Sequence, residues 1–265
     1  MENIKYLNRI SKILRKYILE MLYYSESGHP GGSLSIADVL TYLYVNQNVN
    51  FSSDSNRLIL SKGHAAPALY SLLILCGKYS KDHISQLRKN GSPFQGHPDS
   101  RYIPFLEFSS GSLGQNLSVG AGLSLSDTNN KKTFVIIGDG EIQEGQIWES
   151  LLFSSHHNLE NLYLIIDNNG LQLDGKTDDI ISLGSLDDKL RSFGWNTIKI
   201  DGHSFEQLDY AFNIDFKNTK PTCIITNTIK GKGVSFMEDV VEWHSIHIEN
   251  SKPLIKRALK ELEEQ

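Results

Sequence analysis

Residues 133–144 read TFVIIGDGEIQE, and residues 162–175 read LYLIIDNNGLQLDG. Each stretch begins with a continuous apolar run and ends in a small group of carboxylate, amide and glycine residues. The segment between the two runs, residues 142–161, has the length of a helix. Two continuous apolar runs joined by a helix are typical of parallel strands whose sheet is covered on both faces. These stretches therefore predict an α/β fold.

The same alternation of strands and helices continues through the chain. Further segments with the composition of strands are residues 57–61, 196–200 and 222–228, and those with the composition of helices are residues 3–24, 63–77, 204–212 and 252–264. Ser35 is expected to cap another helix, whose first turn holds Asp38. Residues 92–116, rich in Gly, Pro and Ser, are predicted to form a loop. We predict a doubly wound, mostly parallel sheet with helices on both faces, in a single domain of residues 1–265.

The composition fits a folded protein that acts on small molecules or on other proteins. At 265 residues, 39% hydrophobic and 22% charged, the chain is long enough to bury a substantial core. Its net charge is -5 without a long run of like charges, which argues against binding to nucleic acid or to an anionic membrane. No apolar stretch approaches the length of a membrane span, and we expect a cytoplasmic protein. Cys76 and Cys223, without a CxxC pattern, are expected to be core residues.

Polar residues gather where the two quoted strands end. Asp139 follows the first strand between Gly138 and Gly140, and Asn169 follows the second. Because ligands of open parallel sheets bind beyond the carboxyl ends of the strands, we expect these residues at one site. A carboxylate, an amide oxygen and a nearby carbonyl suit Mg²⁺ or Ca²⁺ better than zinc. A magnesium ion with so few protein ligands normally binds phosphate oxygens as well, so the site predicts a cofactor that carries a diphosphate.

The pairing of GDG with an asparagine motif about thirty residues later resembles the thiamine diphosphate signature. That resemblance implies that Asp139, Asn169 and the backbone carbonyl of Leu171 bind Mg²⁺, with Ca²⁺ or Mn²⁺ as possible substitutes. It also places Gly140 and Glu141 at the cofactor. Taken alone, either motif is also compatible with an ordinary turn.

Five more segments narrow the resemblance to one family. They are SESGHPGGSLS (25–35), ILSKGHAAPALY (59–70), FQGHPD (94–99), SSGSLGQNLSVGAGLS (109–124) and KGKGVSFMEDVVEWH (230–244). In their order and approximate positions they resemble the N-terminal part of transketolases. The resemblance extends over nearly the whole chain, and it implies the thiamine diphosphate-binding fold.

Four of the nine histidines fall in these segments. The resemblance implies that His97 reaches the terminal hydroxyl of the donor sugar, and that His29 and His244 contact the oxygens that gain or lose protons. It places His64, and His244 as well, at the cofactor. Histidine suits these roles because its proton moves near neutral pH. The other five are expected to be surface or packing residues: His83, His156, His157, His203 and His247.

The sequence departs from the family pattern at two places. Residues Gly111, Ser112 and Leu113 match a Gly-Pro-Leu turn that supports the thiamine, but serine replaces the proline. Since proline would stiffen the turn, the replacement either loosens the site or is tolerated because serine adopts the same conformation. After His244 the chain reads SIHIENSKP, which differs from many relatives. Because of this altered segment, the sequence does not determine which donor and acceptor sugars the protein uses.

The resemblance also implies a partner and a reaction. The segments match only the diphosphate-binding part of transketolases, so we expect a separate chain of the pyrimidine-binding type and a two-plus-two heterotetramer. Glu144 and Glu149, expected on the helix after GDG, are placed at the subunit contact. The implied reaction transfers a two-carbon ketol unit from a ketose or ketose phosphate to an aldose.

Other functions stay open at this stage. The α subunit of a 2-oxoacid dehydrogenase also carries GDG and asparagine motifs, and a synthase of deoxyxylulose phosphate shares further segments. A thiamine-fold chain that serves only as a scaffold is a third alternative. A nucleotide-binding oxidoreductase is disfavoured, because no GxGxxG follows a predicted strand.

Overall fold

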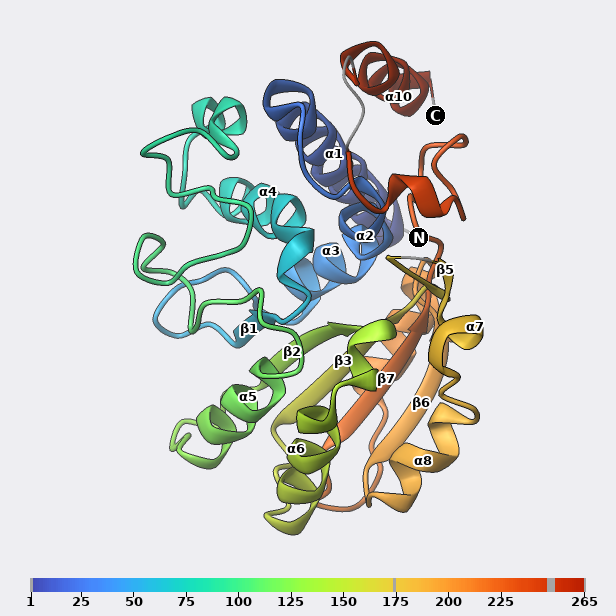
Figure 1. The fold of residues 1–265 in the computed structure, drawn as a ribbon. Helices are drawn as coiled ribbons and strands as arrows, with labels where there is room; N and C mark the ends of the chain where they lie inside the picture. Colours follow the sequence, from blue (N-terminus) through green and yellow to red (C-terminus); the bar gives the residue numbers. More distant parts are fainter. Residues whose placement is uncertain (1, 174, 247–250, 265) are drawn as a thin grey trace.

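The structure is a computed structural model that describes residues 2–173, 175–246 and 251–264 (Figure 1). Within these residues the main sheet has the strand order β1-β2-β3-β7-β6, and every neighbouring pair is parallel. The strands are β1 (Arg57–Leu60), β2 (Thr133–Gly138), β3 (Leu162–Asn168), β7 (Thr222–Asn227) and β6 (Asn196–Asp201). The predicted parallel sheet is therefore confirmed.

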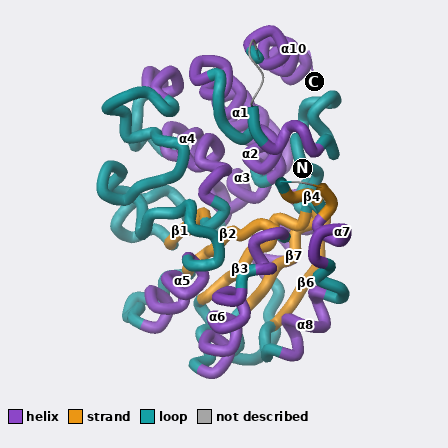
Figure 2. Tube along the Cα trace, viewed as in Figure 1, coloured by secondary structure: helices purple, strands orange, loops and turns teal. Residues whose placement is uncertain are grey.

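Helices cover both faces of this sheet, and Figure 2 shows the strands between two groups of helices. One group is α1 (Glu2–Ser25), α3 (Ala37–Asn46), α4 (Ala66–Leu75) and α9 (Phe205–Asn213), and the other is α5 (Asn116–Leu125), α6 (Gly145–His156) and α8 (Leu186–Ser192). Successive side chains of a strand point to opposite faces. Accordingly, Phe134 and Ile136 pack with the first group, whereas Val135 and Ile137 pack with the second. The predicted two-sided coverage is confirmed.

The remaining elements complete the described chain. They are α2 (Pro30–Ser35), α7 (Thr177–Ile181) and α10 (Lys252–Glu264), the 3₁₀ helices η1 (Gly63–Ala65), η2 (Lys81–Gln86), η3 (Gly140–Gln143) and η4 (Val241–His244), and an antiparallel hairpin of β4 (Leu171–Gln172) and β5 (Gly175–Lys176). The C-terminal helix α10 packs against α1, as Figure 1 also shows.

The predicted capping role of Ser35 is wrong. Ser35 is the last residue of α2, and α3 begins two residues later with Ile36 at its N-cap. The Ser35 hydroxyl instead donates a hydrogen bond of 2.6 Å to the buried carboxylate of Asp167. Asp38 does lie in the first turn of α3, but its carboxylate forms an ion pair with Arg15. A contact with a distant buried charge overrides the local capping preference here.

The structure also bears on the expectations about the cysteines, membrane spans and domain bounds. Cys223 is buried and Cys76 is partly buried, and both are free thiols. No helix in residues 2–173, 175–246 or 251–264 combines the length and apolar character needed to cross a membrane. The single domain of residues 1–265 stays a prediction, and His247 lies outside the described residues.

Two glycines of α5 provide a matched test of how closely this helix packs on the sheet. A Cβ atom at Gly120 would lie 2.4 Å from the Cγ2 atom of Val135, whereas a Cβ atom at Gly122 meets nothing within 4 Å. Gly120→Ala should therefore lower the free energy of unfolding by about 1–3 kcal/mol through overpacking. Gly122→Ala should raise it by about 0.5–1 kcal/mol, because alanine favours a helix. Urea unfolding followed by circular dichroism measures both, and equal effects would contradict this packing.

Candidate active site

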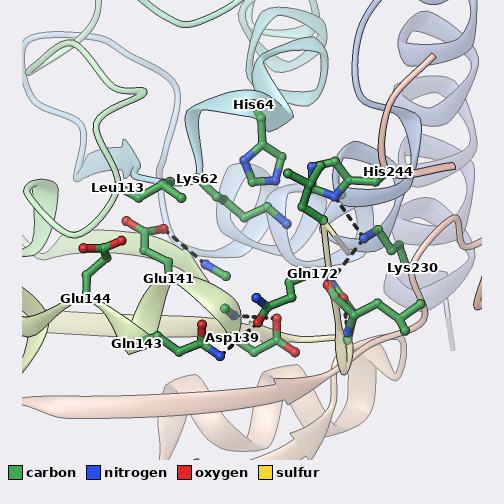
Figure 3. Close-up of a pocket in the computed structure, with 16 residues that line it drawn as sticks. Lys62, His64, Leu113, Asp139, Glu141, Gln143, Glu144, Gln172, Lys230 and His244 are labelled. Atoms are coloured by element: carbon green, nitrogen blue, oxygen red, sulfur yellow. Dashed lines mark hydrogen bonds between the residues drawn. The ribbon is translucent and has the colours of Figure 1, made fainter. Parts of the chain in front are cut away.

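A pocket of about 300 Å³ lies beyond the carboxyl ends of β2 and β3 (Figure 3). The register pairs Gly138 of β2 with Asp167 of β3, so the turns that follow the two strands are neighbours. The residues that line the pocket include most of the predicted site: His64, Leu113, Asp139, Gly140, Glu141, Glu144, Asn169, Leu171 and His244. The structure therefore brings together residues that the sequence separates by up to 180 positions.

Asp139 joins the two turns. One carboxylate oxygen, Oδ2, accepts hydrogen bonds from the Gly170 amide at 2.6 Å and from the Thr177 hydroxyl at 3.2 Å. The other, Oδ1, accepts from the Gly140 amide at 2.9 Å. Burial, together with the nearby Asp167 carboxylate, raises the pKa of Asp139 to about 6. A cation at this position would stabilise the ionised carboxylate.

Asn169 and Leu171 line the same pocket as Asp139, with Asn169 just after β3 and Leu171 at the start of β4. The Asn169 side-chain oxygen accepts a hydrogen bond from the Leu171 amide at 3.1 Å, and its amide nitrogen donates to Asp167 at 3.0 Å. Gly170 between them has φ +73°, a conformation that favours glycine and lets its amide point at Asp139. The turn thus brings two residues with candidate oxygen donors, Asn169 and Leu171, into the same pocket as the Asp139 carboxylate.

These oxygen donors fit a hard cation that takes its remaining ligands from a bound molecule. All three candidate donors are oxygens, which suit Mg²⁺. Among the described residues, no group of three or more His, Cys, Asp or Glu side chains could hold a metal by itself. The ammonium of Lys230 lies 3.4 Å from the Leu171 carbonyl, so that carbonyl already accepts from a cation. The residues therefore fit a metal ion whose coordination is completed by oxygens of a bound ligand.

Two buried lysines, which the sequence did not predict as site residues, add positive charge. Lys62 forms an ion pair with the fully buried Asp167. Although burial alone would raise the pKa of Asp167, this ammonium lowers it below its usual value. Lys230 lies between the Leu171 carbonyl and His244 Nδ1, which is 3.1 Å away, and Figure 3 draws both contacts. Burial and the charge of Lys62 lower the pKa of Lys230 to about 8. These ammonium groups suit an anionic ligand such as a diphosphate.

Three of the predicted histidines form a cluster, and two of them, His64 and His244, line the other side of the pocket. The ring centroids of His29, His64 and His244 lie 5.3–5.4 Å apart, and Figure 3 shows His64 and His244 opposite Asp139. Burial and the charge of Lys62 hold the pKa of His64 well below its usual value. His64 is therefore neutral at physiological pH, with one donor and one acceptor nitrogen.

His97 lies on a separate loop, and its side chain is exposed. It packs over Gly111, where a Cβ atom would come within 3.0 Å of the His97 ring. Gly111 has φ +129°, which few other residues adopt. Burial of part of the ring and the charge of Arg88 lower the pKa of His97. The predicted turn of residues 111–113 and the predicted donor histidine are thus in contact.

The predicted acidic residues occupy three different environments. Glu141 is buried, and its carboxylate accepts hydrogen bonds from the amides of Gly114 at 2.9 Å and Gly138 at 3.4 Å. Its contacts join the loop of residues 111–114 to the end of β2, while its role at the cofactor stays a prediction. Glu149 is exposed on α6, as expected, but Glu144 is the exposed residue just before that helix.

Residues 7–258 match the family model described as "Transketolase, thiamine diphosphate binding domain". The match spans far more than half of the chain. The chain belongs to the transketolase family. The predicted thiamine diphosphate-binding fold is confirmed by this match, and so is the prediction of a transferase of the transketolase kind.

Among the curated relatives, some are named as separate transketolase subunits and others are longer transketolases. One subunit of the apulose-4-phosphate transketolase of Phocaeicola vulgatus is 38% identical over 239 residues, which are 87% of this chain and 85% of the relative. The 6-deoxy-6-sulfo-D-fructose transketolase subunit SqwG of Clostridium sp. is 37% identical over 264 residues, 96% of this chain and 95% of the relative. The transketolase of Homo sapiens is 34% identical over 248 residues, but these are only 38% of the human protein. The predicted resemblance to the N-terminal subunit of a divided transketolase is confirmed.

Solved structures of transketolases have the same fold. The transketolase of Campylobacter jejuni superimposes with a TM-score of 0.87 at 28% identity, over 97% of this chain and 42% of that one. The transketolase of Leishmania mexicana superimposes with a TM-score of 0.80 at 21% identity, over 97% of this chain and 45% of that one, which shows the fold alone.

The lowered pKa of His64 predicts how stability depends on pH. Below the usual histidine pKa of about 6.5, the unfolded chain binds a proton that the folded chain excludes at His64, so acid favours unfolding. In His64→Gln this difference is lost. The fall in the free energy of unfolding between pH 7.5 and pH 5.5 should therefore be smaller by about 1.4 kcal/mol than in the unmodified chain. Urea unfolding at the two pH values measures it, and an unchanged fall would contradict a neutral His64.

Proposed function

We propose that this chain is the diphosphate-binding subunit of a two-chain transketolase that uses thiamine diphosphate and Mg²⁺. The observation that carries the proposal is that one pocket holds an oxygen donor set together with His64 and His244, two histidines that cluster with His29. A metal with a diphosphate accounts for the first half of this pocket. A sugar whose hydroxyl groups exchange protons accounts for the second half.

The cofactor would be held at the strand ends. Asp139, Asn169 and the Leu171 carbonyl would bind the metal, and Lys230 would neutralise charge on the diphosphate. When bound, thiamine diphosphate supplies the carbanion chemistry that cleaves the bond beside a ketose carbonyl. Leu113 would pack against the thiamine, since it lines the pocket with 38% of its surface exposed.

The histidines would handle the sugar. His29 and His244 lie 5.4 Å apart between ring centroids, close enough to contact neighbouring oxygens of one substrate and to exchange protons with them. His97, on the exposed loop, would bind the far hydroxyl of the donor. His64 is neutral and would donate a hydrogen bond to the cofactor while its other nitrogen accepts one.

A second chain would complete the site. The pocket wall leaves Leu173 exposed by 59%, an apolar surface that a partner of the pyrimidine-binding type would cover. Glu144, which also lines the pocket, and Glu149 of α6 are both exposed and are available for a contact between subunits. A two-plus-two heterotetramer, with each cofactor at an interface, satisfies both observations.

The substrates would be a ketose donor and an aldose acceptor. The two bacterial relatives are named for apulose 4-phosphate and for 6-deoxy-6-sulfo-D-fructose, which are different sugars. By analogy, this chain would serve pentose phosphate interconversion or a specialised sugar pathway. The segment after His244 differs from many relatives, and residues 247–250 within it lie outside the described part.

Reconstitution tests this proposed function. The purified chain alone should release no aldose from a panel of ketoses and ketose phosphates, because the residues that contact the thiamine ring from the other side would belong to the partner chain. Adding a partner chain of the pyrimidine-binding type, with thiamine diphosphate and Mg²⁺, should produce ketol transfer. Equal transfer by the isolated chain would refute the division into subunits. Turnover of pyruvate instead of a ketose would favour a different thiamine enzyme.

His97→Ala tests the role assigned to the exposed histidine. In the reconstituted pair, loss of one hydrogen bond to the donor should lower kcat/KM for the ketose by about tenfold. The affinity for thiamine diphosphate, measured by calorimetric titration, should stay unchanged. His157→Ala, just after the far end of α6, is the control and should alter neither quantity. A parallel loss of cofactor affinity in His97→Ala would contradict the role.

A further inference from the structure

A buried charged network lies behind the pocket, formed by residues that line no part of it. The Arg15 guanidinium of α1 forms two hydrogen bonds with the Asp38 carboxylate of α3, at 2.8 and 2.7 Å. The same carboxylate binds Nδ1 of His203 at 2.7 Å. Although burial alone would raise the pKa of Asp38, Arg15 and His203 lower it below its usual value. Asp38 is therefore ionised, and its charge is compensated inside the protein.

Both ends of this network bind one short segment of the chain, residues 229–233. Nε2 of His203 accepts a hydrogen bond from the Ile229 amide at 2.9 Å. Nε of Arg15 donates to the Lys232 carbonyl at 3.0 Å. A Cβ atom at Gly233 would lie 2.9 Å from the Arg15 side chain, so the segment packs directly on the guanidinium stem. The network thus fixes the segment on both sides of Lys230.

The segment needs such support because its sequence is permissive. Gly231 has φ +81° and Gly233 has φ +95°, and glycine loses much conformational freedom when it is ordered. Between these constraints Lys230 is almost completely buried, with its ammonium directed at the Leu171 carbonyl and at His244. Burying an ammonium is costly, so its position must be imposed by the surrounding structure.

The hydrogen bonds fix the tautomer of His203. Because Nε2 accepts from an amide, it carries no proton, and Nδ1 must hold the proton that it shares with Asp38. Asp38 therefore orients the ring, and the ring orients Ile229. This order of contacts runs from a charge in α3 to the backbone that carries Lys230.

We propose that Arg15, Asp38 and His203 are positioning residues, which hold the segment of residues 229–233 so that Lys230 meets the diphosphate. The proposal rests on the proposed function, since it assumes that Lys230 binds this group. It assigns a role to His203, for which the sequence predicted only a place at the surface or in packing. None of the three lines the pocket, so their effect on the cofactor would pass through the position of Lys230.

Two variants of His203 separate this role from mere stability. An asparagine amide can replace Nδ1 and keep the bond to Asp38, whereas a glutamine amide can reach the place of Nε2 and keep the bond to Ile229. In the reconstituted pair with Mg²⁺, His203→Asn should weaken the binding of thiamine diphosphate by about fivefold to tenfold, the effect of one lost hydrogen bond. His203→Gln keeps the bond to Ile229 and loses only the bond to Asp38, so it should weaken binding less, by about twofold to threefold. Calorimetric titration measures both.

A double variant shows whether the effect of His203→Asn passes through Lys230. In a chain that already carries Lys230→Ala, His203→Asn should change the affinity for thiamine diphosphate by less than about twofold, because coupled residues are not additive. Its effect on the urea midpoint should be the same in both backgrounds. This contrast separates positioning from stability.

The outcomes are distinguishable. Equal affinities of the Asn and Gln variants, or a full effect of His203→Asn in the Lys230→Ala background, would overturn the positioning role while leaving the proposed function intact. If the unmodified pair binds no thiamine diphosphate, the proposed function fails, and the positioning role fails with it.

Discussion

The parallel register of β2 and β3 is the constraint on which the site depends. Pairing Gly138 with Asp167 brings the turn after one strand beside the turn after the other. The Asp139 carboxylate then meets the Gly170 amide at 2.6 Å, and the oxygens of Asn169 and Leu171 line the same pocket. A shift of one residue in this register would turn each side chain of the shifted strand to the opposite face. The two buried cores therefore fix the position of the metal donors.

Several charges are buried around this pocket, and two of the carboxylates are paired with buried basic side chains. Lys62 pairs with Asp167, and Arg15 pairs with Asp38. Buried ion pairs contribute little net stability, because desolvation offsets most of their attraction. Their concentration around one pocket is more typical of a functional site than of a core that serves only folding. Lys230 is the exception, since its ammonium lies beside a carbonyl and His244, and a diphosphate would provide the missing negative charge.

The sequence allowed the sheet and much of the site to be predicted, since both depend on local patterns. Continuous apolar runs revealed the strands, and Asp139 was recognisable because it directly follows one of them. Contacts between distant segments could not be predicted in this way. The hydrogen bond of Ser35 with Asp167 spans 132 residues, and that of His203 with Asp38 spans 165. Lys62 and Lys230 lie within the matched segments, but no sequence pattern around them indicates that their side chains are buried. Such roles depend on which side chains the fold brings together.

The most direct test is to locate the metal in crystals of the reconstituted pair grown with thiamine diphosphate and Mn²⁺ in place of Mg²⁺. Anomalous scattering identifies the ion directly. The account predicts one manganese per cofactor, bound by the Asp139 carboxylate, the Asn169 side-chain oxygen and the Leu171 carbonyl, at distances near the roughly 2.1 Å typical of magnesium. Manganese bound elsewhere, or a diphosphate away from the ends of β2 and β3, would contradict it.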